Sequence, residues 1–398
     1  MNPINISIQN QKSGKLFFNE AKREYGFNYE KGAKAISLSM PYRESTYLSH
    51  YHLHPIFEMN MPEGYLFEIF KNFLSKEHGY MNDFLILSYL SPNIEGRLTF
   101  KSDFERKIFQ AIDIDELLEN DTEDTFLRVL QTFLDKNAIS GVQPKTLALA
   151  IDKKTLLLKE YIVKTWGEEY PCLAHNEYYS MKAVQRAGVT IPSIQLSKNG
   201  KFLLVEKFDY QKESDSFIGF EEVLVLFGKN RDKKYSGSYE QIAKLIYAVT
   251  TNKRHSMEQF YKTVVMNYLL KNGDAHLKNF GVIYDNNFKN IGFAPAYDIV
   301  TTTAYIYKDK PALIMFGKKI WWGKEELLRF GVEHCYFSKS EAMVHYSSCM
   351  NALKESIELL KRAITEDEKF APIGSKMLAS WSISLDEKSY KELPHENF

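Results

Sequence analysis

Cysteine is scarce in this sequence of 398 residues, and the few cysteines follow no pattern. Cys172, Cys335 and Cys349 are an odd number, and they lack the paired spacing of a zinc site. The sequence therefore argues against a disulfide framework. It predicts a protein of a reducing compartment, which we take to be the cytoplasm.

Net charge and long apolar runs are missing as well. The 51 Lys and Arg residues equal the 51 Asp and Glu residues, so no overall field draws the chain to nucleic acid. A local basic run at residues 229–234, KNRDKK, is interpreted as a solvated loop. No stretch approaches 18 uninterrupted apolar residues, and the N-terminus lacks a signal-peptide pattern. Neither export nor a membrane span is predicted.

The composition is that of a chain that folds throughout, with 44% hydrophobic and 14% aromatic residues. Its length favours two or three domains. We expect an α+β N-terminal subdomain at residues 1–105, a small lobe at 106–210 and a mainly helical lobe at 211–398. The charged stretch 101–125 is the candidate for the domain boundary after the N-terminal subdomain.

Hydrophobic periodicity predicts the elements of each part. The first half is expected to contain β-rich residues 14–40, helical residues 62–90, strands 146–151 and 155–164 around a turn at 152–154, a helix 177–187, and strands 193–196 and 201–208. The second half is expected to contain helices 239–250, 257–270, 324–330 and 339–364, with a hairpin of 280–284 and 290–294. Ser256 and Gln259 resemble a capping box at the start of the second of these helices.

The stretch GDAHLKN at residues 273–279 carries the chemistry. An aspartate five residues before an asparagine is the catalytic-loop spacing of a protein-kinase-like phosphotransferase. Asp274 would accept the proton of a substrate hydroxyl, and Asn279 would bind a metal ion on ATP. Asp298 follows the predicted hairpin, where such enzymes carry a second metal ligand. The donor set suits Mg²⁺. The alternative is that Asp274 only caps a loop and Asp298 only begins a turn.

Other residues are candidates for binding ATP. Lys164 ends an apolar strand, where an ammonium group needs a partner such as a phosphate, unless it extends to the surface. Glu177, on the next predicted helix, would pair with Lys164 or be an exposed carboxylate. The stretch 140–145, with Gly141, Gln143 and Lys145, has one glycine and is no Walker A loop, yet its backbone could cradle phosphate.

The segment after the second hairpin, where the two lobes should join, is a candidate adenine site. The backbone at Glu206 would bind adenine, with Phe208 stacking on the ring and Asp209 near the ribose. Without the order of the elements, the same segment would be a plain loop. His276 is interpreted as a histidine that braces the catalytic loop, because Asp274 already supplies a base.

The sequences SGVQPKTLAL, YIVK, LVEKFD, NGDAHLKN and APAYDI together resemble the HipA family of toxin serine/threonine kinases, and MPEG with ISLSMP resembles that family's N-terminal subdomain. The resemblance spans the chain and implies a two-lobed α+β protein-kinase-like fold. It implies an ATP- and Mg²⁺-dependent kinase that phosphorylates a protein, typically an aminoacyl-tRNA synthetase, and slows translation and growth. A small DNA-binding antitoxin of the HipB kind is the implied partner, with DNA bound only through it.

By position, the resemblance assigns Asp274 as the base, Asn279 and Asp298 as magnesium ligands, and Lys164 as the phosphate lysine. It also places Tyr297 at the adenine pocket. Family members autophosphorylate a serine of the phosphate loop, often three residues before its glycine. That position is Ala138 here, so Ser140 is the alternative candidate.

Two other functions stay open at this point. A small-molecule or phosphoinositide-like kinase uses a similar catalytic loop. An inactive module that only binds an antitoxin is the other alternative.

Overall fold

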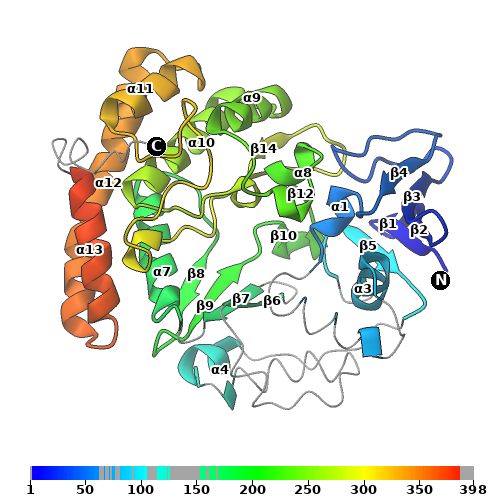
Figure 1. The fold of residues 1–398 in the computed structure, drawn as a ribbon, viewed down its shortest axis with the longest axis horizontal. Coiled ribbons are helices and arrows are strands. Elements are labelled where there is room, and N and C mark those ends of the chain that lie inside the picture. Colours follow the sequence, from blue (N-terminus) through cyan, green and yellow to red (C-terminus); the bar gives the residue numbers. More distant parts are fainter. Residues whose placement is uncertain are drawn as a thin grey trace. The chain divides into compact units, whose positions relative to one another are not determined.

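The computed structural model describes most of the chain. The described residues are 2–61, 67, 71, 74–76, 81–91, 94–104, 114–122, 124–125, 153–157, 161–166 and 169–385. They form two compact units, Met1–Glu169 with Ser197–Lys234, and Tyr170–Leu196 with Tyr235–Phe398 (Figure 1). The domain boundaries expected at residues 105 and 210 stay predictions.

The first unit contains a five-stranded antiparallel sheet of order β4-β3-β2-β1-β5. Its strands are β1 (Ile4–Ile8), β2 (Gln11–Asn19), β3 (Glu24–Tyr29), β4 (Tyr47–His50) and β5 (Leu98–Lys101). The short helix α1 (Pro55–Glu58) and the apolar helix α3 (Asp83–Leu90) share the buried core of this sheet. Strands are confirmed within residues 14–29 and a helix within 62–90, with Asn82 as the N-cap of α3, whereas residues 31–40 form no strand and that part of the prediction is wrong.

A second sheet of this unit holds Lys164. Strands β6 (Lys153–Leu157), β7 (Tyr161–Trp166) and β9 (Phe202–Glu206) pair in that order, all antiparallel. The predicted turn at 152–154 is wrong for Lys153 and Lys154, which pair with Trp166 and Thr165. The predicted single strand 155–164 is two antiparallel strands. The strand-forming residues on both sides of Lys159 and Glu160 read as one run, and the pattern alone did not reveal that the chain reverses within it.

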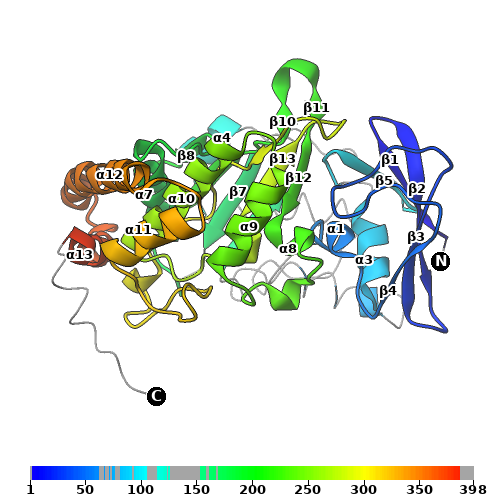
Figure 2. The ribbon, with the colours of Figure 1, turned by 90° about the horizontal axis from the view of Figure 1, so that it is seen from above.

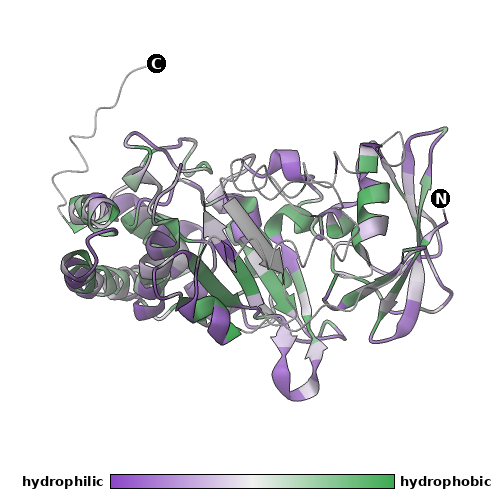
Figure 3. Cartoon of the chain, turned by 90° about the horizontal axis from the view of Figure 1, so that it is seen from below, coloured by the Kyte–Doolittle hydropathy of each residue, from purple (hydrophilic) through white to green (hydrophobic). Residues whose placement is uncertain are grey.

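The remaining elements of the first unit follow β9. A small hairpin of β10 (Tyr210–Gln211) and β11 (Ser216–Phe217) is mostly hydrophilic, as Figure 3 shows. The chain continues through β12 (Gly219–Glu222) and α8 (Val223–Leu226), and the short helix α4 (Ile114–Glu119) lies earlier in the sequence.

Carboxylates tie residues 219–234 to the N-terminal subdomain. Glu221 is fully buried and accepts hydrogen bonds from the backbone N–H groups of Leu38, at 2.5 Å, and Ser39, at 3.1 Å. Arg231 donates its backbone N–H to Glu58 at 2.9 Å and pairs through its guanidinium with Asp83 at 3.1 Å. The basic run 229–234 was interpreted as a solvated loop, and for Arg231 this is wrong, since its side chain is only 28% exposed.

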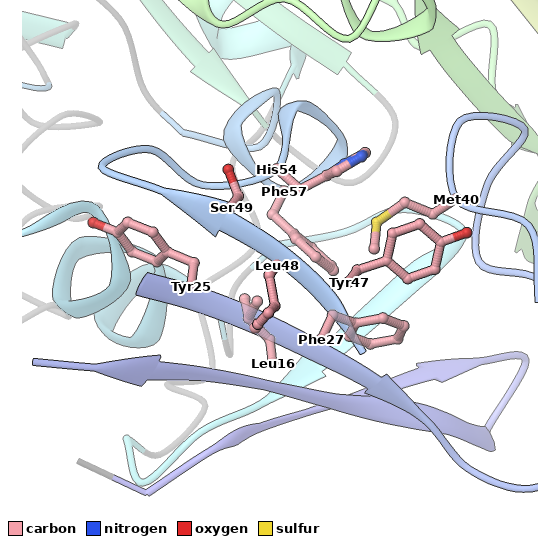
Figure 4. A pocket seen from close by; sticks show the side chains of 10 residues that line it. Leu16, Tyr25, Phe27, Met40, Tyr47, Leu48, Ser49, His54 and Phe57 are labelled. Atoms are coloured by element: carbon pink, nitrogen blue, oxygen red, sulfur yellow. The ribbon is translucent and has the colours of Figure 1, made fainter. Parts of the chain in front are cut away.

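A small pocket lies in the N-terminal subdomain, between the sheet and α1 (Figure 4). Its volume is about 10 Å³, room for about one water molecule. His54 and Phe57 of this pocket come from the start of α1, and burial lowers the pKa of His54 to about 4. The pocket is too small for a nucleotide, and we do not assign a binding site to it.

The second unit is mainly helical. Its elements are α7 (Leu173–Arg186), β8 (Ile194–Leu196), α9 (Tyr239–Val249), α10 (Lys253–Leu269), β13 (Gly281–Tyr284), β14 (Ile291–Phe293), α11 (Lys324–Glu333), α12 (Lys339–Glu366) and α13 (Ala371–Leu385). Strands β13 and β14 pair antiparallel, and α12 and α13 lie side by side in both Figure 1 and Figure 2. The α+β fold expected from the sequence is confirmed, as are the hairpin and the helices predicted in this half.

Two details of the helices differ from expectation. The capping box at Ser256 and Gln259 is wrong, because α10 begins at Lys253 and Asn252 accepts from the backbone of His255. The first turn of α10 is polar, so apolar periodicity reveals the helix only from Met257. Helix α13 was not predicted, since Pro372, Gly374 and several serines weaken its helical signal. Among the described residues, no helix has the length and apolar character needed to cross a membrane.

Replacing Arg231 with leucine tests how residues 219–234 are anchored. The side chain of Glu58 is 4% exposed, and burial raises the pKa of Glu58 while Arg231 lowers it. Arg231→Leu leaves this carboxylate without its cation, so we expect the free energy of unfolding in urea to fall by about 3 kcal/mol. The neighbouring variant Asp232→Ala changes an exposed charge and should shift it by less than about 0.5 kcal/mol. Equal effects of the two variants contradict the anchoring role.

Candidate active site

The catalytic loop begins where helix α10 ends. Lys271 adopts a left-handed conformation with φ of 58°, which turns the chain out of the helix after the cap at Leu270. Asn272 then links helix and loop, because its amide donates to Asn267 at 2.8 Å and its Oδ1 accepts from the backbone of Asp274 at 3.1 Å. Asp274 thus stands half-buried just past a helix end, as the sequence predicted.

The structure brings Asn279 and Asp298 together. The hairpin β13–β14 returns the chain to the catalytic loop, and Asn279 Nδ2 donates to Asp298 Oδ2 at 2.9 Å across 19 residues of sequence. Asn279 is 7% exposed, and its Oδ1 accepts from the backbone N–H of His276 at 2.9 Å. Asp298 has φ of 57°, a conformation that is uncommon for residues other than glycine. Such strain often accompanies functional positions.

The donor atoms of this pair fit a magnesium ion. Carboxylate and amide oxygens are hard ligands of the kind that Mg²⁺ prefers, and few protein ligands are needed because phosphates and waters complete its coordination. Asn279 Oδ1 accepts from the backbone of His276, and Asp298 Oδ2 accepts from Asn279, so both oxygens lie at the end of the catalytic loop. The predicted metal ligands are therefore adjacent and chemically suitable, and their role stays a prediction.

The glycine of the motif is required by close packing. A Cβ on Gly273 would lie 2.0 Å from Oδ2 of Asp309 and 2.9 Å from the backbone oxygen of Lys310. The backbone N–H of Gly273 donates to Oγ1 of Thr302 at 2.8 Å. The segment that follows Asp298 therefore lies directly against the residue before Asp274.

Buried polar contacts hold that following segment from two helices. Asn176 on α7 exchanges hydrogen bonds with the backbone of Thr301, at 2.7 and 3.0 Å, and is completely buried. The indole N–H of Trp381, on α13, donates to Oγ1 of Thr301 at 2.8 Å. Sequence reasoning missed both residues. Asn176 stands directly before the predicted helix 177–187, and α13 itself gave little signal. The alternative of an exposed Glu177 is wrong, because its side chain is buried.

A buried lysine borders the catalytic loop. Burial lowers the pKa of Lys271 to about 7, and its Nζ lies 5.1 Å from the ring centroid of Trp321. The backbone oxygen of Lys271 accepts from Thr302 N at 3.2 Å. This lysine therefore lies buried where the chain turns from α10 into the catalytic loop.

Tyr297 and His276 also contact the loop. The hydroxyl of Tyr297 donates to the backbone oxygen of Lys278 at 2.5 Å. His276 is 5% exposed, and its ring meets the ring of Tyr235 edge-on at 5.2 Å between centroids. Both side chains therefore pack on the catalytic loop, and the predicted roles of Tyr297 at adenine and of His276 as a brace stay predictions.

The nucleotide residues predicted in the first unit are placed as follows. Lys164 is 7% exposed in β7, opposite Leu203 of β9, so it is no surface lysine. Glu206 ends β9 and pairs with Lys212 at 2.7 Å. The ring of Phe208 meets Phe220 edge-on at 5.1 Å. Burial raises the pKa of Asp209. Their roles at ATP stay predictions, as does the pairing of Lys164 with Glu177, because these two residues belong to different units.

The predicted phosphate loop lies outside the described residues. This concerns Gly141, Gln143 and Lys145, together with Ala138 and the possible autophosphorylation site Ser140.

Family profiles match both parts of the chain. The HipA-like C-terminal domain matches residues 137–359, and the HipA N-terminal domain matches residues 4–101. Each match includes the corresponding motifs quoted above.

Curated relatives carry the name of putative kinases. One from Haemophilus influenzae is 32% identical over 184 residues, which cover 42% of this chain and 53% of the relative. The putative kinase Y4dM of Sinorhizobium fredii is 24% identical over 263 residues, which cover 60% of this chain and 62% of the relative. The chain thus spans only about half to three fifths of the length of these relatives.

A solved structure shares the fold. HipA of the Shewanella oneidensis toxin–antitoxin system, solved with HipB and its operator DNA, aligns over 98% of this chain and 100% of its own, with a TM-score of 0.71. At 15% sequence identity, this likeness concerns the fold alone.

An added methyl group at Gly273 should disturb the catalytic loop. We expect Gly273→Ala to lower the free energy of unfolding by about 2 kcal/mol, because a well-packed segment must move to admit the Cβ. Gly292→Ala is the matched control, since a Cβ there has no atom within 4 Å. The measurement is urea denaturation of both variants. Asp309→Ala should restore part of the loss in the double variant, and purely additive effects would contradict the packing argument.

Proposed function

The chain belongs to the HipA family, and from this premise we propose that it is an ATP- and Mg²⁺-dependent serine/threonine protein kinase. The observation that carries the proposal is the hydrogen bond between Asn279 and Asp298, which sets two magnesium-type ligands beside the loop of Asp274. This arrangement reproduces the order of base, first ligand and second ligand in kinase catalytic lobes.

In the proposed reaction, Asp274 takes the proton of the acceptor hydroxyl as its oxygen attacks the γ-phosphorus. The new oxygen–phosphorus bond replaces the bond to the β-phosphate, and ADP leaves. Asn279 and Asp298 would hold Mg²⁺, whose charge would offset that of the phosphates. Lys164, buried in β7, would contact a phosphate, which is the role that the family resemblance assigns to it.

The adenine end of ATP is assigned to Glu206, Phe208, Asp209 and Tyr297. A backbone edge, aromatic rings and a carboxyl group near a ribose are the groups expected at a nucleoside pocket. Gly141, Gln143 and Lys145 would contact the phosphates, and Ser140 is the proposed site of autophosphorylation.

The proposed substrate is a protein, by family an aminoacyl-tRNA synthetase, whose phosphorylation inhibits translation and growth. The proposed partner is a small DNA-binding antitoxin like HipB. This proposal is supported by the Shewanella oneidensis structure, in which HipA, HipB and operator DNA were solved together. The chain's zero net charge favours DNA binding through the partner rather than by the kinase.

Loss of either charged group should abolish phosphotransfer. We expect Asp274→Asn and Asp298→Asn to lower the rate of ³²P transfer from ATP by a factor on the order of 10³, because one removes the base and the other a metal ligand. Both variants should keep the thermal unfolding midpoint of the wild type within a few degrees. Asp232→Asn, at an exposed position, is the matched control and should be fully active. Retained activity in either site variant overturns the assignment.

Cells that express the protein should reveal its target. We expect wild-type expression to arrest growth and Asp274→Asn expression to leave growth unchanged. Phosphoproteomics of the two cultures should then show serine or threonine sites that depend on Asp274. Labelling of a lipid or metabolite without any protein would favour the small-molecule kinase alternative. No labelling at all, with retained antitoxin binding, would favour the inactive module.

A further inference from the structure

Tyr235 contacts the carboxylate of Asp274 directly. Its hydroxyl donates a hydrogen bond to Oδ1 of Asp274 at 2.9 Å, and both residues belong to the second unit. No motif pointed to this tyrosine, which lies 39 residues before the aspartate in a stretch of charged and small residues.

The ring of Tyr235 is supported by the catalytic loop itself. It meets the ring of His276 edge-on, with 5.2 Å between the ring centroids and 76° between the ring planes. Aromatic pairs favour this edge-to-face arrangement. Tyr235 is 47% exposed and is no part of the buried core. Core packing is therefore a poor explanation for its position, whereas the contact with Asp274 is specific.

The backbone that follows Tyr235 is fixed. The oxygen of Gly237 accepts from the backbone of Ile314 at 3.2 Å, and Ser238 forms a capping box with Gln241 at the start of α9. A phenol has only two side-chain torsions, so anchored backbone and ring contact leave the hydroxyl little freedom. A hydroxyl held in this way is suited to a permanent contact with Asp274. It is less suited to a contact that a substrate displaces.

We propose that Tyr235 is a positioning residue of the catalytic base. By donating to Oδ1 it restricts rotation of the Asp274 carboxylate, so that the other oxygen takes the proton of the acceptor hydroxyl. The phenol stays neutral and transfers no proton. This inference rests on the proposed function, and it adds the residue that orients the base of that reaction.

The test compares Tyr235→Phe with the wild type in the full-length protein. Phenylalanine keeps the ring against His276 and removes only the hydroxyl. The assay is ³²P transfer from ATP to the proteins of a heat-treated bacterial lysate, with the ATP concentration varied. We expect the rate at saturating ATP to fall about tenfold, because a hydrogen bond that orients the base is lost. The KM for ATP should stay within about twofold, because the proposed role of the tyrosine is at the base and not at the nucleotide.

The matched control is Tyr247→Phe. Tyr247 is also an exposed tyrosine with an aromatic neighbour, Tyr336 at 4.3 Å, and its change should leave the rate unaltered. The single variant Asp274→Asn should be inactive. Adding Tyr235→Phe to it should change nothing further, because the tyrosine acts only through the aspartate.

The outcomes separate this inference from the kinase assignment. An unchanged rate in Tyr235→Phe overturns the positioning role, provided that Asp274→Asn is inactive. A higher rate overturns it too, because the hydroxyl would then compete with the acceptor for the base. A raised KM for ATP with an unchanged maximal rate would instead place Tyr235 at the nucleotide. Full activity of Asp274→Asn, or an inactive wild type, defeats the proposed function itself.

Discussion

The candidate site depends on one hydrogen bond, from Asn279 to Asp298. The bond closes the chain between the catalytic loop and the end of the β13–β14 hairpin, so that two residues separated by a strand pair act at one place. Asp298 can occupy its left-handed conformation because the next residues are bound by Asn176 and Trp381 through Thr301. Strain at a functional residue is thus balanced by buried polar contacts from two distant helices.

Close packing on one side of the loop complements this bond. Gly273 brings backbone against backbone, where Asp309 and Lys310 leave no room for a side chain. A glycine also permits close packing of α12 and α13, since a Cβ on Gly374 would lie 2.6 Å from the side chain of Ile364. In both places a glycine permits an approach that positions a more distant functional group, rather than a turn. Gly374 of α13 thus lets this helix pack closely against α12, and the same helix carries Trp381 to Thr301.

The order of the elements along the chain could be predicted because it depends on short-range sequence patterns. The hairpin after GDAHLKN has an Asp-Asn-Asn turn, and α9 and α12 show clear apolar periodicity. The reversal between β6 and β7 and the helix α13 have no such pattern, so they were missed. Tertiary contacts such as Asn176 to Thr301 are not predictable from a single sequence, because the partners lie 125 residues apart and neither belongs to a motif.

The charged stretch 229–234 shows why composition alone misleads. Its charge suggested a solvated loop, yet Arg231 is bound within the first unit by Glu58 and Asp83. Four residues later, in the second unit, Tyr235 binds Asp274. Both contacts join a long polar side chain to a carboxylate that the sequence places far away. Within the second unit, the ring contact with His276 and the anchored backbone at Gly237 restrict the phenol, and this restriction favours Tyr235 as a fixed support of the base over a mobile cap.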